Sequence, residues 1–538
     1  MTHYPVLIVG GGPVGMALAA ELGRYGVRCL LVEQTDGTID HPRASALNSR
    51  TMEFCRRWGI VGKVQEVGTP PDFPHDSLYC TSLTGYLIAR IPRPSHGGGA
   101  APLPHTPERP QRCNQLWFNP VLRDHVRRLR SVEFRMRCRL ESYRRDGGRF
   151  VAELSDLDSD RSELVTADYL VAACGGRSPL PKSIGVAMSD DTILSHSVNI
   201  FFRVKALWTL HDKGKAALNF FIGPDGMWGG LTAQDGREYW RLTLHGTKHF
   251  VDPKTVDAHG CVRRLYGGPF PYELINVIPW ARREWVADRF VDDDARIFLV
   301  GDAAHQNSPT GGFGMNTGMG DAIDLGWKLA AAVQGWAGPR LLRSYESERR
   351  PVALRNVREA ATNFERYTLP DTALVEDPGA AGAALRRTLG DDLVRTQSRM
   401  ILTDGVALGY RYEGSPIVER DGTAEPSDEP GVYRPTARPG HRAPHFWLAD
   451  GRSVLDLFGR GFVALRFGAD APDARPFAEA AAARGVPLEV DDVADPAARP
   501  LYESRLALVR PDGHVAWRGD SLPADPLGVI DRVRGAGN

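Results

Sequence analysis

Near its start the chain reads VLIVGGGPVGMALA over residues 6–19, an apolar run followed by spaced glycines and helix-forming residues. This order predicts a buried strand, a tight turn and a helix. In the GxGxxG pattern Gly10 permits the turn, Gly12 lets the backbone approach a pyrophosphate, and Gly15 lets the helix pack closely on the strand. The segment therefore predicts the phosphate-binding start of a dinucleotide fold.

An acidic residue at the end of a second predicted strand strengthens this interpretation. The apolar run 30–32 leads into Glu33, eighteen residues after the last glycine of the motif, where a carboxylate can accept hydrogen bonds from a ribose. Gln34 follows it, while Pro13 and Val14 begin the helix whose positive end faces the diphosphate. Together these features favour a dinucleotide site over an ordinary glycine turn, but they do not separate FAD from NAD.

A second glycine-rich segment, RIFLVGDAAHQNSPTGGFGMNTGMGDAIDLGWKLA, occupies residues 296–330. We expect a strand that ends near Asp302, a loop, and a helix that starts near Asn316. At the strand end, the Asp302 carboxylate is placed to accept from a sugar-alcohol hydroxyl. The amides of Gly314, Met315 and Asn316 are expected to point from the helix start at an anion.

Composition limits the classes of function. The 538 residues predict two to four domains at roughly 100 to 200 residues each. Lys plus Arg equals Asp plus Glu at 66, so the net charge of zero offers no basic field to a nucleic acid or a membrane surface. Neither a membrane-length apolar run nor a leader is apparent, and the seven cysteines lack metal-ligand spacing. We expect a cytoplasmic protein without a metal site.

The two glycine segments, in this order, closely resemble the FAD-dependent aromatic hydroxylases with the para-hydroxybenzoate hydroxylase fold, over the chain to about residue 400. The resemblance implies that one FAD spans both segments. In it, Arg43 contacts the pyrophosphate, and Gln115 bonds the sugar chain. Asp302 binds the ribityl hydroxyls, and Pro309 lies over the flavin ring. The implied FAD contacts are Gly10, Gly12, Pro13, Val14, Gly15, Glu33, Gln34, Arg43, Gln115, Asp302, Pro309, Gly312, Gly314, Met315 and Asn316.

Within this family the chain is most similar to natural-product tailoring members, namely aromatic polyketide hydroxylases and the rebeccamycin-pathway flavin hydroxylase. The resemblance implies that NADPH or NADH reduces the FAD, that O2 then forms a C4a-hydroperoxide, and that an electron-rich ring attacks its distal oxygen. The expected partner is a polycyclic aromatic small molecule, and the neutral chain favours an uncharged one. Whether the protein is a monomer or a homodimer stays open.

Two other functions remain open at this point. One is an FAD oxidase or dehydrogenase that uses the same site without transferring oxygen. The other is a flavoprotein that binds and protects an unstable pathway intermediate, with little turnover of its own. A departure from the family pattern keeps the second of these open, because Cys174 stands where the family has an Asp, and Pro181 where it has an Arg. Arg177 and Lys182 are candidates to replace the lost contacts.

Substrate-contacting residues are less well defined by the sequence. Tyr239, Arg241, Thr243 and His245 alternate along a predicted strand and so share one face, which is either solvated or a pocket lining. We name Tyr239 and Arg241, with Trp228 and Pro309, as pocket candidates. No catalytic base is assigned.

The fold class that follows is α/β. We expect a Rossmann-like FAD-binding domain with an inserted β-sheet substrate domain and a C-terminal thioredoxin-like domain that contains no cysteine. The expected segments are FAD-binding residues 1–80, 111–185 and 286–400, a substrate-domain loop 81–110, a β-rich substrate domain 186–285, a linker 401–444 and a thioredoxin-like domain 445–538.

Overall fold

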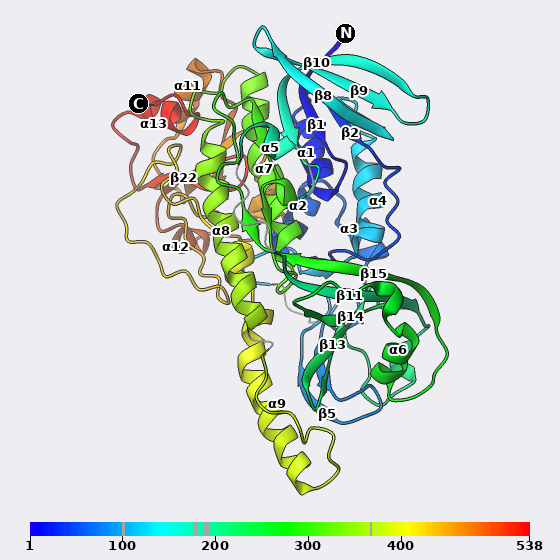
Figure 1. Ribbon diagram of the computed structural model, residues 1–538. Helices are drawn as coiled ribbons and strands as arrows, with labels where there is room; N and C mark the ends of the chain where they lie inside the picture. Colours follow the sequence, from blue (N-terminus) through cyan, green and yellow to red (C-terminus); the bar gives the residue numbers. More distant parts are fainter. Residues whose placement is uncertain (99–102, 177–179, 187–192, 366–367, 538) are drawn as a thin grey trace.

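A parallel sheet forms the centre of the α/β unit in the computed structural model, which describes residues 1–98, 103–176, 180–186, 193–365 and 368–537 (Figure 1). Its strand order is β7-β2-β1-β10-β9-β8, and β17 pairs with β10. Strands β7, β2, β1, β10 and β17 are parallel to one another, whereas β9 is antiparallel to both β10 and β8. The strands are β1 Thr2–Val9, β2 Cys29–Glu33, β7 Val132–Met136, β8 Cys138–Asp146, β9 Arg149–Asp156, β10 Arg161–Ala172 and β17 Ile297–Leu299.

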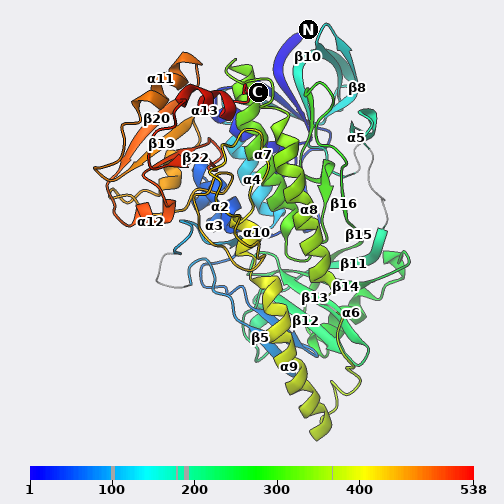
Figure 2. The same ribbon diagram turned by 90° about the vertical axis from the view of Figure 1, so that its left-hand side faces the viewer.

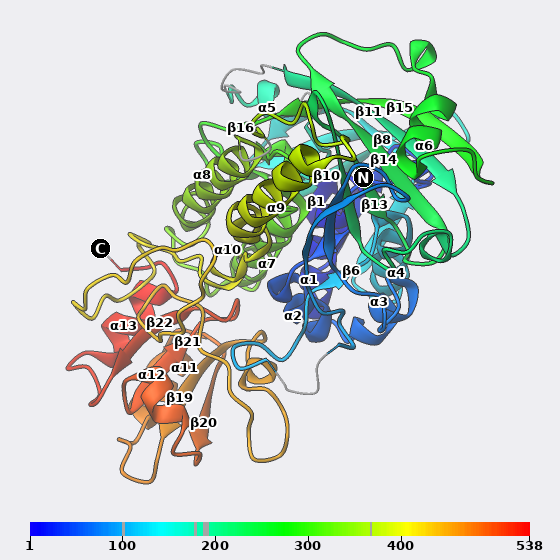
Figure 3. The same cartoon turned by 90° about the horizontal axis from the view of Figure 1, so that it is seen from below.

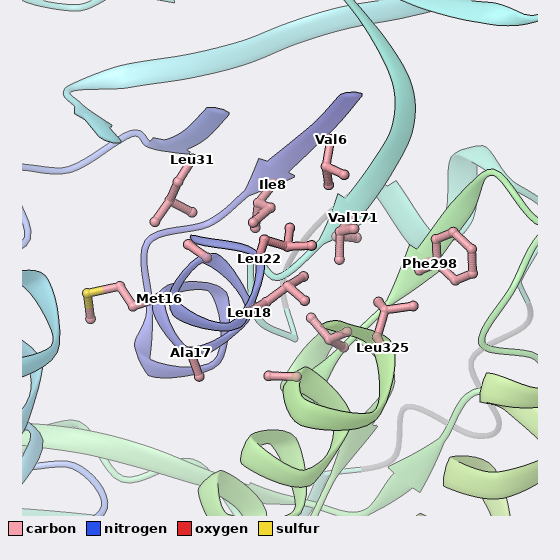
Figure 4. Close-up of a cluster of buried hydrophobic side chains, with 14 of the residues drawn as sticks. Val6, Ile8, Met16, Ala17, Leu18, Leu22, Leu31, Val171, Phe298 and Leu325 are labelled. Atoms are coloured by element: carbon pink, nitrogen blue, oxygen red, sulfur yellow. The ribbon is translucent and has the colours of Figure 1, made fainter. Parts of the chain in front are cut away.

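Apolar strands and two helices make the core of this unit. Helix α1 (Pro13–Arg24) and helix α7 (Phe313–Val333) both pack on the sheet, and Figure 4 shows Leu18, Val171 and Leu325 between them. Continuous apolar runs are typical of parallel strands that are buried on both faces. The unit is completed by β3 Ala46–Leu47, α2 Ser49–Arg57, α3 Val61–Val67, β6 Gln111–Arg112, α4 Gln115–Val126, α5 Leu180–Ser183, β16 Trp285–Val286, β18 His305–Gln306 and α8 Ser344–Glu365.

A second sheet carries the inserted unit, in the order β15-β11-β14-β13-β12-β4-β5. Helix α6 (Ala258–Tyr266) covers one face, on which Trp240 and Leu242 are buried. Its strands are β4 Ser77–Cys80, β5 Leu87–Ile91, β11 Ile193–Arg203, β12 Leu218–Gly223, β13 Gly226–Ala233, β14 Tyr239–Thr247 and β15 Glu273–Arg283. Strand β4 therefore belongs to this sheet, although it falls within the segment 1–80 that we assigned to the FAD-binding domain. The long helix α9 (Ala380–Ile401) packs against β5.

The C-terminal residues form a third unit, the tail, with strand order β20-β19-β21-β22. Strands β19 and β20 are parallel, and β21 and β22 are antiparallel to their neighbours, as in a thioredoxin-like fold. This fold class was expected and is confirmed. Figures 2 and 3 show the tail and the inserted sheet on different sides of the α/β unit. The tail comprises β19 Phe462–Phe467, α11 Arg475–Ala483, β20 Leu488–Val493, α12 Ala498–Tyr502, β21 Leu506–Val509, β22 Val515–Gly519 and α13 Pro526–Val533.

The segment 401–444, which its Pro- and Gly-rich composition predicts as a linker, packs against its neighbours. It contains helix α10 (Asp404–Leu408), and Tyr410 and Tyr412 are buried beside His514 of the tail. These aromatic contacts bury the segment against the tail, which its composition alone did not predict.

A buried cluster of charges joins the tail to the α/β unit. Arg510 contacts Glu348 of α8 at 2.6 Å, Asp324 of α7 at 3.1 Å and its neighbour Asp512 at 2.6 Å. Lys328 contacts Asp324 at 2.8 Å and Glu348 at 2.5 Å. Because all of these side chains are withdrawn from water, each charge depends on its partners.

Replacing Arg510 is predicted to destabilise the protein. Arg510→Met leaves Asp324 and Glu348 with Lys328 and takes the arginine from Asp512, and removing one partner of a buried ion pair typically costs about 3–5 kcal/mol. We expect a clearly lower urea midpoint, followed by circular dichroism. The control is Arg144→Met, because Arg144 and its partner Asp146 are both exposed, and its midpoint should match the wild type. Equal midpoints for the two variants would contradict this role of the cluster.

Candidate functional site

One large cavity of about 2060 Å³ runs from the glycine turn after β1 to the inserted sheet. A pocket for a single drug-sized ligand has a volume of roughly 300–1,000 Å³. The cavity therefore has room for a dinucleotide and a second molecule. The expected residues that line it are Gly10, Gly12, Pro13, Val14, Glu33, Gln34, Arg43, Gln115, Asp302, Pro309, Gly312, Gly314 and Met315.

The three motif glycines serve different purposes. Gly10 has φ +115°, and a Cβ there would lie 2.4 Å from the carbonyl oxygen of Ala173. A Cβ on Gly15 would lie 2.0 Å from the carbonyl oxygen of Gly10, so this residue is needed for the helix to pack. A Cβ on Gly12 would meet no protein atom within 4 Å, and its φ of −68° is open to any residue. The fold itself therefore does not require glycine at position 12, and the backbone there is open to the approach of a ligand.

Glu33 is held at the cavity by hydrogen bonds from the backbone. Its Oε2 accepts from the amide of Gly11 at 2.8 Å, and its Oε1 accepts from the amide and the hydroxyl of Thr35 at 2.9 and 2.8 Å. These bonds orient a carboxylate at the end of β2, as a ribose-binding acid requires.

Gln115 links the starts of two helices that meet at the cavity. It is the first residue of α4, its amide donates to the carbonyl of Ala44 at 3.0 Å, and its Nε2 lies 3.4 Å from Sδ of Met315 in α7. The N-cap Asn114 donates to the carbonyl of Arg43 at 3.1 Å, which holds the Arg43 loop beside the same helix start.

Asp302 presents an unsatisfied acceptor to the cavity. Within the described residues, no hydrogen-bond donor contacts its carboxylate, which is exposed to the cavity but otherwise surrounded by protein. This burial raises the pKa of Asp302, while His305 and Arg43 oppose the rise. The turn is fixed by Asp321, which accepts from the amide of Gly301 at 3.0 Å and contacts His305 at 2.8 Å. Ribityl hydroxyls are donors that fit this acceptor.

Helix α7 starts three residues earlier than we expected. Its N-cap is Gly312, at φ +69°, and the Gly312 amide donates to the carbonyl of Pro309 at 3.1 Å. In an α-helix the amides of the first three helical residues lack an internal partner, and here these belong to Phe313, Gly314 and Met315. All three residues line the cavity, and a Cβ on Gly314 would meet no protein atom within 4 Å. Their dipole favours an anion or an electron-rich ring edge.

We expected the Asn316 amide to face a bound anion, and the structure corrects this expectation, because Asn316 does not line the cavity. Its Nδ2 donates to the carbonyls of Gly312 at 2.7 Å and Ala46 at 2.9 Å, and its Oδ1 accepts from the amide of Asn48 at 3.1 Å and the hydroxyl of Thr51 at 2.7 Å. Asn316 ties strand β3 and helix α2 to the start of α7.

The inserted sheet supplies the other end of the cavity. Strand β14 contributes Arg241, Thr243 and His245 to the cavity lining. Of the two alternatives for this face of the strand, it therefore lines a pocket. The structure corrects two pocket candidates. Tyr239 lies outside the cavity and stacks on Phe201 with 5.7 Å between ring centroids. Trp228 also lies outside it, stacked on Phe221 at 5.3 Å with Arg264 over its ring at 4.3 Å.

Burial lowers the pKa of the two titratable residues of β14 that line the cavity, His245 and Arg241. It lowers the pKa of His245 to about 4, so the imidazole is neutral at physiological pH. It also lowers the pKa of Arg241 to about 10, at which the guanidinium remains charged. Thr243 donates to Oδ1 of Asn199 at 2.7 Å, which fixes the strand face between these two residues.

Other residues also line the cavity, and the sequence analysis missed Tyr79, Arg93 and Arg112 among them. Tyr79 and Phe220 form a stacked pair with centroids 4.9 Å apart, and Arg93 and Arg112 lie on the same cavity. They come from β4, β12, the loop after β5 and β6, so no local motif joins them. Only the long-range pairing of β4 with β12 brings the aromatic pair together.

The departure from the family pattern lies beside the glycine turn. Cys174 lines the cavity, and a Cβ on Gly10 would lie 2.7 Å from its Cα. Pro181 is buried and Lys182 is exposed, whereas Arg177 lies outside the described residues. Lys182, which we named as a candidate to replace the lost contacts, does not line the cavity.

Two family descriptions match the chain: "FAD binding domain" over residues 3–360 and "Aromatic-ring hydroxylase, C-terminal" over residues 436–535. Tetracenomycin B2 monooxygenase-dioxygenase of Streptomyces olivaceus is 34% identical, over 99% of this chain and 98% of the relative.

Solved structures are similar over the whole length. RebC soaked with chromopyrrolic acid, with bound 7-carboxy-K252c, is 41% identical with a TM-score of 0.92 and covers 100% of both chains. A ternary complex of aklavinone-11 hydroxylase with FAD and aklavinone is 29% identical with a TM-score of 0.82 and covers 99% of both chains. The expected FAD cofactor is thereby confirmed.

None of the helices in the described part of the chain combines the length and the apolar character that a membrane span needs. Among the same residues, no group of three or more His, Cys, Asp or Glu side chains is arranged to hold a metal ion.

Gly12→Asp is predicted to abolish FAD binding without unfolding the protein. A Cβ at this position meets no protein atom within 4 Å, whereas the new carboxylate occupies the approach of the pyrophosphate and repels it. The matched control is Gly62→Asp, because Gly62 also has open space around its Cβ position and lies on the exposed start of α3. We expect colourless Gly12→Asp protein and yellow control protein, both with wild-type circular dichroism. Flavin retained at wild-type level in Gly12→Asp would refute the placement.

Proposed function

Because the chain belongs to the FAD-dependent aromatic-ring hydroxylases, we propose that it hydroxylates or oxidatively rearranges a polycyclic aromatic metabolite of the polyketide type, in secondary-metabolite biosynthesis. The observation that carries the proposal is the single cavity, which joins a dinucleotide-binding turn to an aromatic-lined sheet face. The full-length similarity to a tetracenomycin monooxygenase and to aklavinone-11 hydroxylase supports the substrate class.

The residues at the dinucleotide end fit FAD. An open Gly12, an oriented Glu33 and an unsatisfied Asp302 match a pyrophosphate, a ribose and a ribityl chain in that order. When bound, FAD accepts electrons from NADPH or NADH and activates O2 for transfer to the substrate. The free amides at Gly314 and Met315 would stabilise negative charge at the edge of the ring that faces them.

The residues at the sheet end act on the substrate. The cation of Arg241 favours the ionised form of a phenol, which makes the ring electron-rich. Neutral His245 is able to accept a hydrogen bond from a substrate hydroxyl, because its lowered pKa of about 4 leaves the imidazole unprotonated at pH 7. Once FAD and substrate fill the cavity between the sheet and α7, they would keep water away from the reacting groups.

The proposal extends to location and partners. We propose a cytoplasmic enzyme with O2 as co-substrate, without nucleic-acid or membrane partners, as a monomer or homodimer. Its reductants, NADPH and NADH, are intracellular, and all seven cysteines are free thiols, which suits a reducing compartment.

The central prediction concerns coupling between substrate and oxygen transfer. With tetracenomycin B2 or aklavinone as the polycyclic probe, we expect faster oxidation of NADPH or NADH by the yellow holoenzyme. One oxygen atom from labelled O2 should appear in the product, measured by mass spectrometry. A product without labelled oxygen would favour an oxidase. Unchanged cofactor oxidation with both probes would favour a protein that binds and protects an intermediate.

A further inference from the structure

Three buried side chains hold the turn that carries Asp302. Oδ2 of Asp321 accepts from the backbone amide of Gly301 at 3.0 Å and lies 2.8 Å from Nε2 of His305. Gly301 and His305 stand on either side of Asp302, so one carboxylate fixes both ends of the turn. The third side chain is Arg349 of α8, whose Nε donates to Oδ1 of Asp321 at 2.8 Å.

The fold itself sets the position of Arg349. Its guanidinium also donates to the carbonyl of Thr317 at 2.9 Å, and its carbon lies 5.2 Å from the ring centroid of Tyr410. A Cβ on Gly320 would lie 2.7 Å from one of its terminal nitrogens. A glycine at this point of α7 therefore leaves the space through which the arginine reaches Asp321, the next residue of the helix.

The charges of this group keep Asp321 ionised. Burial alone raises the pKa of a carboxyl group, but the neighbouring His305 and Arg349 outweigh it and hold the pKa of Asp321 below its ordinary value. An ionised carboxylate accepts shorter and stronger hydrogen bonds than a neutral acceptor does. The hold of Asp321 on the turn therefore depends on Arg349.

The tail reaches the same two helices one position further on. Arg510 contacts Glu348 at 2.6 Å, and Glu348 directly precedes Arg349 in α8. Arg510 also contacts Asp324 at 3.1 Å, which lies three residues after Asp321 in α7. All of these side chains are buried. The tail thus fastens together the segments of α7 and α8 that hold the turn.

We propose that Asp321 and Arg349 are positioning residues for the flavin half of FAD, and that the tail acts on FAD binding through them. They hold the turn so that the carboxylate of Asp302 faces the ribityl hydroxyls. This inference rests on the proposed placement of FAD and makes no assumption about the substrate. It also gives a function to a thioredoxin-like domain that contains no cysteine.

The experiment is a double-mutant cycle on FAD affinity. The full chain is freed of flavin and titrated with FAD, and binding is followed by the quenching of flavin fluorescence. Asp302→Asn and Arg349→Met should each weaken binding at least about tenfold, as expected for a lost hydrogen bond to a charged group. The double variant should bind no more weakly than the weaker single variant, because Arg349 acts through Asp302.

Two further variants extend the cycle. Asp321→Asn keeps the shape of the side chain and removes its charge, so it should weaken FAD binding in the same non-additive way even if Arg349→Met fails to fold. Arg510→Met tests the tail. It should weaken FAD binding less than Arg349→Met does, because Glu348 keeps its contact with Lys328 at 2.5 Å. This effect should also disappear in the Asp302→Asn background.

The matched control is Arg442→Met. Arg442 is as deeply buried as Arg349, and its Nε donates to Glu53 at 3.1 Å. After the substitution Glu53 keeps Arg50 at 2.8 Å, just as Asp321 keeps one partner when Arg349 is replaced. Neither Arg442 nor Glu53 lines the cavity. We therefore expect a lower free energy of unfolding but wild-type FAD affinity.

Additive losses in the double variant, or wild-type FAD affinity in both Arg349→Met and Asp321→Asn, would overturn the proposal. An equal loss in Arg442→Met would also overturn it, because the losses would then reflect only lower stability. Wild-type affinity in Arg510→Met would refute the role of the tail. Wild-type affinity in Asp302→Asn alone would contradict the placement of the ribityl chain. None of these readouts needs turnover, so failure of oxygen transfer would contradict the proposed function alone.

Discussion

The packing of Gly15 against the carbonyl oxygen of Gly10 is the constraint on which the site depends. No side chain fits between them, so α1 lies directly against the turn after β1. Helix α7 also packs closely on α1, because a Cβ on Gly318 would lie 2.6 Å from the side chain of Val14. Two helix starts are thereby brought to one cavity, and each presents a positive end and free amides to it.

The two ends of the cavity use charge in opposite ways. At the dinucleotide end, the carboxylates of Glu33 and Asp302 line the cavity, where they can accept hydrogen bonds from the hydroxyls of a ligand. At the sheet end, Arg112 and Arg241 have no carboxylate at ion-pair distance among the described residues, whereas Arg510 lies within a cluster of three carboxylates. A net charge of zero therefore conceals a segregation of charge inside the molecule. Both of these arginines line the cavity, where a ligand can supply the negative charge.

Local patterns in the sequence were sufficient for the fold class and for most of the dinucleotide end. The GxGxxG turn, Glu33 and Asp302 each follow a strand, and their spacing along the chain sets their place in space. The start of α7 was misplaced because Gly312, in a left-handed conformation, ends the loop earlier than composition indicates. Alternation assigned Tyr239 and Arg241 to one face of β14, but it did not show where along the strand the cavity begins. Arg93 and Arg112 depend on tertiary packing and have no local signal.

The most direct test of this account is a crystal structure of the holoenzyme. We expect the pyrophosphate of FAD at the start of α1 beside Gly12, and the polar edge of the flavin ring within hydrogen-bond distance of the amides of Gly314 and Met315. The ring should then separate these amides from the wall formed by β14. Density for the flavin ring away from the start of α7, with the adenine end at α1, would contradict the claim that one cofactor joins the two helix starts.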